Sequence, residues 1–145
     1  MRKLSERIFK LREEKMTLQD NLNNVQEMID WKKYDDAEKL CSDLITDLQI
    51  EESVRKSGLA EIFNIWGLIM YKKVEFNKAQ SLYKKSIEMN PSLAAAYYNH
   101  GVINYRLGLF DSALKDFQKA VQLDPDNLEF SAGLQASKIA LDGLH

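Results

Sequence analysis

The chain has 145 residues, with 20 Lys and Arg against 22 Asp and Glu and a formal net charge of −2. This length is enough for one domain with a sizeable core. The near balance of charge argues against nucleic acid as the main ligand, because phosphate binding needs a basic face. No apolar run approaches the roughly 20 residues of a membrane span. Cys41 is the only cysteine, so an internal disulfide is excluded and a reducing, cytoplasmic location is expected.

Residues 1–31 contain neither Gly nor Pro, and their apolar residues recur at spacings of four and three: Leu4, Ile8, Leu11, Leu18, Leu22, Val25 and Ile29. This spacing predicts a helix with one apolar seam. In one interpretation the seam packs on the next helix of its own domain, and only about residues 1–17 project beyond it. In the other, Leu4, Ile8 and Leu11 dock the chain as a coiled coil, onto a larger assembly or a second copy of itself.

A four-residue marker follows at three places: an aromatic residue, then Asp or Asn, then any residue, then Ala. It begins at Tyr34, Phe76 and Phe110. We expect the Asp or Asn to cap the second helix of a helix pair, and the Ala to let that helix approach its neighbour closely. Cys41, in the first of these helices, is expected to be a core residue.

Residues 60–93 recur as 94–127, a shift of 34 residues that pairs Ala60/Ala94, Gly67/Gly101, Ile69/Ile103, Tyr71/Tyr105, Phe76/Phe110, Ala79/Ala113 and Pro91/Pro125. A repeat of this length is one supersecondary unit used again. The two glycines lie inside predicted helices, where glycine costs about 1 kcal/mol, so we expect them to permit close helix packing.

The first marker departs from this spacing, because Ala37 lies 42 residues before Ala79. The extra residues fall between about positions 46 and 58, as a longer helix or an inserted charged loop. Residues 128–145 read as a last helix that covers the array, with Asp126 and Asn127 as possible caps.

The third unit resembles the tetratricopeptide repeat (TPR), a helix–turn–helix unit, at Tyr97, Gly101, Tyr105, Ala113, Phe117, Ala120 and Pro125. The resemblance implies an all-α fold, a short right-handed TPR solenoid of about three helix–turn–helix units. The single domain, 1–145, then comprises an N-terminal helical extension (1–17), a degenerate first repeat (18–51, with an insertion to about 59), two further repeats (60–93 and 94–127) and a capping helix (128–145).

The resemblance also implies a non-enzymatic adaptor for protein–protein interactions, with a partner peptide or helix bound in the concave groove. The groove residues are then Asn64, Leu68, Tyr71, Lys72, Tyr98, Asn99, Val102, Tyr105 and Arg106. The first unit would add Leu22, Gln26, Ile29 and Asp30. Several of these residue types are common throughout the family, so an alternative is that they serve folding alone.

Some TPR cochaperones hold the C-terminal carboxylate of heat-shock proteins in a five-residue clamp of Lys, Asn and Arg. Of these positions only Asn99 matches, and Glu129 stands where a base is needed, so the sequence argues against such a clamp. No catalytic, metal or cofactor site is expected. The histidines are His100, at the position of Trp66 in the preceding unit, and His145, and no metal-ligand spacing is present.

Overall fold

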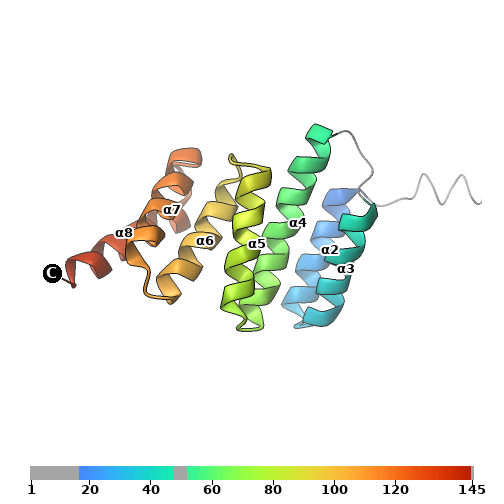
Figure 1. Ribbon diagram of the computed structural model, residues 1–145, viewed down its shortest axis with the longest axis horizontal. Helices are drawn as coiled ribbons and strands as arrows, with labels where there is room; N and C mark the ends of the chain where they lie inside the picture. Colours follow the sequence, from blue (N-terminus) through green and yellow to red (C-terminus); the bar gives the residue numbers. More distant parts are fainter. Residues whose placement is uncertain (1–16, 48–51, 145) are drawn as a thin grey trace, which may run out of the picture.

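A computed structural model describes residues 17–47 and 52–144 of the chain. Within these ranges every regular element is an α-helix: α2 (Leu18–Asp30), α3 (Tyr34–Asp47), α4 (Glu52–Lys72), α5 (Phe76–Met89), α6 (Ala94–Arg106), α7 (Phe110–Leu123) and α8 (Leu128–Asp142). The helices follow one another along the long axis of the molecule, from α2 and α3 at one end to α8 at the other (Figure 1). The fold is therefore an all-α solenoid of helical repeats.

The helices form an inner and an outer layer. Each helix contacts the next one in the chain, and α2, α4, α6 and α8 also contact one another in series. Among the described residues, the alternate helices α3, α5 and α7 make no such contacts with one another. The first helices of the pairs are thus close together while the second helices are splayed apart, which makes the inner layer concave.

The extra length of the first unit is at least partly helical. Helix α4 begins at Glu52, eight residues before Ala60, and runs for 21 residues to Lys72. Helix α6, at the corresponding place in the next unit, begins at Ala94 and has 13 residues. Of the two alternatives for the insertion, the longer helix accounts for residues 52–59, and residues 48–51 lie outside the described part.

The three turns within the helix pairs have the same backbone geometry. The residues Lys32, Val74 and Gly108 adopt left-handed φ values of 59°, 61° and 77°. In each turn the next residue donates its N–H to a carbonyl five positions back, with N···O distances of 2.8 Å in all three. This is the Schellman arrangement, which satisfies carbonyls at the end of a helix and normally places glycine at the left-handed position.

The capping prediction is wrong for α5 and α7. These helices begin at Phe76 and Phe110, so Asn77 and Asp111 are already inside the first turn, and neither helix has a side-chain cap. The short Schellman turn leads directly into the second helix and leaves no extended residue for an Asp or Asn to occupy. The cap predicted for α8 is confirmed, because Asn127 Oδ1 accepts the Phe130 N–H at 3.1 Å.

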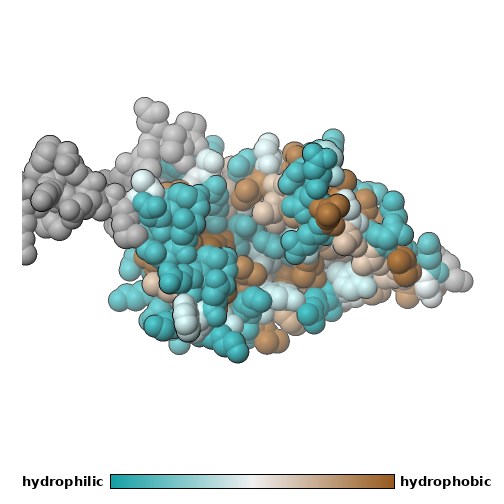
Figure 2. Space-filling view, turned by 180° about the vertical axis from the view of Figure 1, so that it is seen from behind, coloured by the Kyte–Doolittle hydropathy of each residue, from teal (hydrophilic) through white to brown (hydrophobic). Residues whose placement is uncertain are grey.

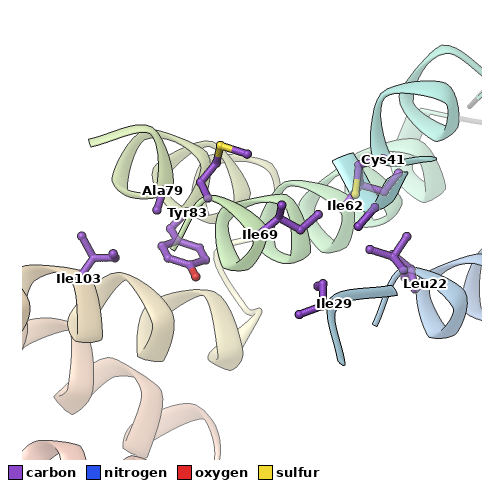
Figure 3. Packing of buried hydrophobic residues seen from close by; sticks show 11 residues of the cluster. Leu22, Ile29, Cys41, Ile62, Ile69, Ala79, Tyr83 and Ile103 are labelled. Atoms are coloured by element: carbon purple, nitrogen blue, oxygen red, sulfur yellow. The ribbon is translucent and has the colours of Figure 1, made fainter. Parts of the chain in front are cut away.

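The core runs through the helix pairs, and Figure 3 shows Leu22, Ile29, Cys41 and Ile62 at one end of it, with Ala79, Tyr83 and Ile103 at the other. Cys41 is fully buried, as predicted, and burial raises the pKa of its thiol to about 12. A thiol with this pKa stays protonated and unreactive at neutral pH.

The apolar seam of the N-terminal segment packs within its own domain where the structure describes it. Leu22, Val25 and Ile29 are buried in the core cluster. The predicted docking residues Leu4, Ile8 and Leu11 lie outside the described residues. Thr17 caps α2, accepting the Asp20 N–H at 3.1 Å while the Asp20 carboxylate accepts the Thr17 N–H.

The surface is uneven in polarity. Hydrophilic side chains gather over the N-terminal helices in Figure 2, and apolar patches occur among the helices toward the C-terminal end. The exposed large apolar residues of this half are Val74, Tyr105, Leu107, Leu109, Leu128, Ile139 and Leu144. Helix α8 packs on α6 and α7 but leaves Leu128 and Ile139 in solvent.

Replacing Val74 with Gly should raise the free energy of unfolding by about 1 kcal/mol. A side chain in the left-handed region costs about 1–2 kcal/mol, part of which is offset by the greater flexibility of glycine in the unfolded chain. The Val74 side chain is 70% exposed, so little packing is lost. The reciprocal change Gly108→Val should destabilise by a similar amount. Urea unfolding followed by circular dichroism measures both changes. If the Val74→Gly protein is no more stable than the unmodified chain, Val74 is not strained in the left-handed conformation.

Gly101→Ala should destabilise the protein by about 2 kcal/mol, although alanine is the better helix former. A Cβ at this position would lie 2.8 Å from Cε1 of Phe117, whose ring is buried. The added cost should shrink in a Phe117→Leu background, because leucine has no ring at that point. A double-mutant cycle measured by urea unfolding tests the coupling, and strictly additive effects would show that the ring is not the obstacle.

Candidate functional site

In the part of the chain that the structure describes, two open hollows lie on the inner layer. The first is bounded by α2, α4 and α6, and five predicted groove residues line it: Leu22, Gln26, Asn64, Leu68 and Asn99. The second lies between α6 and α8, and four predicted residues line it: Tyr98, Val102, Tyr105 and Arg106. Because both hollows use side chains of α6, they are neighbours along the same concave layer.

Asn64 and Asn99 join the second and third repeats. Asn99 Nδ2 donates to Asn64 Oδ1 at 2.9 Å, and the pair is partly buried. The bond fixes the orientation of both amides and uses one polar atom of each. Asn64 Nδ2 is left as a donor and Asn99 Oδ1 as an acceptor. A peptide backbone presents the complementary carbonyl and N–H groups.

Tyr98 is anchored to the wall of the second hollow. Its ring stacks on Phe130 at a centroid distance of 4.9 Å and lies 5.6 Å from Phe117. Its hydroxyl donates to Glu129 Oε1 at 3.1 Å. Burial, and then this hydrogen bond, raise the pKa of Tyr98 to about 12. The phenol is therefore neutral and held in place at physiological pH.

Cationic side chains mark the C-terminal ends of the two central inner helices. Lys72 ends α4 and Arg106 ends α6, and both are exposed. The Arg106 guanidinium lies 5.7 Å from the ring centroid of Tyr71, within the range of a cation–π interaction. Lys72 and Tyr71 are outside the lining of both hollows. Tyr105 is 38% exposed, with its ring 5.1 Å from that of Phe110.

The groove residues expected from the first unit separate into two kinds. Leu22 and Ile29 are both buried in the core. Leu22 also lines the first hollow, whereas Ile29 lines neither hollow and does not offer a binding surface. Gln26 lines the first hollow, and its Nε2 donates to Asp30 Oδ1 at 3.1 Å. The prediction for Ile29 is wrong because the first unit matches the repeat signature poorly. Its groove positions therefore could not be assigned reliably by alignment with the other two units.

Sequence reasoning missed several lining residues. Glu61 and Ile65 share the inner face of α4 with Asn64 and Leu68, and their helical spacing was a usable signal. Gly133 and Ala136 of α8 line the second hollow. The small side chains at these two positions of the last helix could have indicated a space beside Tyr98.

In the part of the chain that the structure describes, no three His, Cys, Asp or Glu side chains gather as a possible metal site. In the same ranges, no helix is long and apolar enough to cross a membrane.

Residues 94–127 match the model of the tetratricopeptide repeat. A UDP-N-acetylglucosamine–peptide N-acetylglucosaminyltransferase of Giardia intestinalis is 39% identical over 67 residues, which are 46% of this chain and 4% of that protein. DnaJ homolog subfamily C member 7 of Mus musculus is 38% identical over 77 residues, or 53% of this chain and 15% of that protein. The chain therefore spans only a small part of these two relatives, and what it shares with them is a repeat segment.

Among solved structures, the first TPR of Spaghetti (RPAP3) bound to the HSP90 peptide SRMEEVD superimposes with a TM-score of 0.71. The superposition covers 86% of this chain and 93% of that one, with 18% sequence identity. Likeness at this level of identity establishes the shared fold.

Raising the pH from about 9 to about 12 should lower the free energy of unfolding. Unfolded tyrosines ionise near pH 10, whereas the pKa of Tyr98 in the fold is about 12, and burial also raises the pKa of Tyr83. The contribution of both phenols is therefore complete below about pH 10 and is lost as the pH rises through the folded-state pKa values. Urea midpoints across this range should fall less steeply for Tyr98→Phe than for the unmodified chain. If the urea midpoint falls equally steeply with pH in both proteins, ionisation of Tyr98 does not contribute to the loss of stability.

Proposed function

We propose that this chain, a tetratricopeptide-repeat protein, is a non-enzymatic adaptor that binds a peptide or helical segment of a partner protein in its concave inner layer. The observation that carries the proposal is the pair of neighbouring hollows joined by the hydrogen-bonded Asn64 and Asn99. TPR proteins such as the DnaJ homolog that matches this chain share the repeat, and the Spaghetti neighbour has a peptide bound.

The lining suggests how a segment would be held. The amides of Asn64 and Asn99 are fixed against each other and suit a peptide backbone. The second hollow has aromatic walls and a floor of small residues, which suits an apolar side chain. Arg106 at its rim would attract a carboxylate on the same segment.

A heat-shock carboxylate clamp fits these residues poorly. Glu129 stands where a clamp base is needed, and its carboxylate is bonded to Tyr98. A carboxylate placed beside Glu129 would meet a like charge, which disfavours its binding there. Our proposal is therefore an adaptor with a different ligand from the HSP90 peptide bound by the Spaghetti neighbour.

The surroundings of Cys41 and His100 support a binding role over catalysis. The Cys41 thiol is buried and its raised pKa keeps it protonated. His100 is outside the lining of both inner hollows and is bonded to Asp116. We further propose an intracellular, reducing location, on the ground that the sequence has one cysteine and it is used for packing.

Replacing Asn64 and Asn99 together by Ala should weaken partner binding by about tenfold or more, the worth of one or two hydrogen bonds. Removing both members of the pair leaves neither amide unpaired, so the fold should survive. Affinity capture from native extract with the unmodified and double-Ala chains should identify the proteins lost from the variant. The dissociation constant is then measured with a purified segment of such a protein.

The matched control is Gln118→Ala with Gln122→Ala, two exposed side chains on α7 in the outer layer. This variant should keep every partner. If a folded Asn64→Ala/Asn99→Ala chain also keeps every partner at unchanged affinity, the groove is not the working surface. The search then moves to the N-terminal seam at Leu4, Ile8 and Leu11, the site of the alternative structural role.

A further inference from the structure

The outer layer has a hollow of its own, with a volume of about 660 Å³, between α5 and α7. Tyr97, His100 and Asn104 of α6 line its floor. Lys84 of α5 and Lys115 of α7 line the two sides. None of these residues lines the hollows of the inner layer, so this is a separate surface.

The preceding repeat has apolar residues at the corresponding positions. A shift of 34 residues places Trp66 on His100, Met70 on Asn104 and Leu82 on Asp116. Met70 is buried in the core cluster, and Trp66 and Leu82 pack against it. In the third repeat, smaller polar side chains replace this apolar group, and a polar hollow is present beside them.

The polar replacements form a connected network. Asp116 Oδ2 lies 2.8 Å from His100 Nδ1 and accepts from Asn104 Nδ2 at 2.8 Å. Gln80 Nε2 donates to Asn104 Oδ1, also at 2.8 Å. Asn104 is only 2% exposed. Burying such a network is commonly no more stabilising than a well-packed apolar core, so stability does not explain the change from the apolar group of the second repeat.

The charges around the hollow are unequal. Lys84 and Lys115 are exposed on opposite walls, while Asp116 is the lining carboxylate and is already bonded to His100 and Asn104. The hydroxyls of Tyr97, Ser81 and Ser112 add further donors. The rim therefore offers positive charge and hydrogen-bond donors to a ligand rich in acceptors.

We propose that this outer hollow is a second binding site, which accepts an acidic segment of a partner protein with a carboxylate held between Lys84 and Lys115. The polar floor of His100 and Asn104 keeps the site open and hydrated, where the second repeat is filled by Trp66. This proposal does not depend on the function of the inner groove.

A fluorescein-labelled hexaglutamate peptide is the probe, with binding followed by fluorescence anisotropy at low salt. Lys84→Glu with Lys115→Glu should weaken its binding by about tenfold or more, because two attractive charges become repulsive. Lys39→Glu with Lys138→Glu is the control of equal charge change, since both lysines are exposed on other helices and outside the hollow. This control should change binding by less than about twofold.

A second variant separates the hollow from its rim. His100→Trp, Asn104→Met and Asp116→Leu copy the second repeat, filling the hollow while both lysines remain. Binding should be lost and the urea midpoint should rise or stay unchanged. The charge-reversal pair tests the site independently if this variant does not fold.

Four results would overturn the proposal: no saturable binding, an equal loss in the Lys39/Lys138 control, undiminished binding by a folded filled variant, or equally effective competition by inorganic phosphate at matched ionic strength. The last result would show a general anion site and not one for an acidic segment. The Asn64→Ala/Asn99→Ala chain should bind the hexaglutamate probe normally. The proposal for the outer hollow and the proposal for the inner groove can therefore fail independently of each other.

Discussion

Within a repeat, the two helices approach closely because an aromatic ring of the second helix fills the space left by a glycine of the first. A Cβ on Gly67 would lie 2.5 Å from the Tyr83 ring, and one on Gly101 would lie 2.8 Å from the Phe117 ring. A Cβ on Gly133 of α8 would also lie 2.8 Å from the Phe117 ring, so this ring packs against a glycine on each of its two neighbouring helices. These rings are buried, so the spacing of the pairs, and with it the shape of the inner layer, depends on them.

The two layers follow from that spacing and have different chemistry. Helices α2, α4, α6 and α8 touch in series, so their inner faces form a continuous surface on which Asn64 and Asn99 meet. Among the described residues, the backbones of α3, α5 and α7 do not come close to one another, which leaves gaps that side chains must fill. Trp66 packs at such a place in the second repeat, whereas His100 and its polar partners occupy the equivalent place in the third.

At two kinds of position the repeat geometry overrides the conformational preference of the residue that occupies it. Val74 takes a left-handed conformation that suits Gly108, because the same Schellman turn is needed in every pair. Asn77 and Asp111 do not cap, because the turn enters the helix without an extended residue. In both cases the constraint is the distance between paired helices, and the local preference of one residue is too small to change it.

The sequence alone determined the repeat, the helix pairs and the role of Gly67 and Gly101, because these depend on spacing along the chain. It also predicted some of the side chains that line the hollows of the inner layer, since one face of a helix is fixed by its periodicity. Only the tertiary structure decided which side chains meet across helices: the Asn64–Asn99 bond, the anchoring of Tyr98 by Glu129, and the network around Asp116. These contacts join residues 12 to 35 positions apart, and their existence depends on how the helices stack.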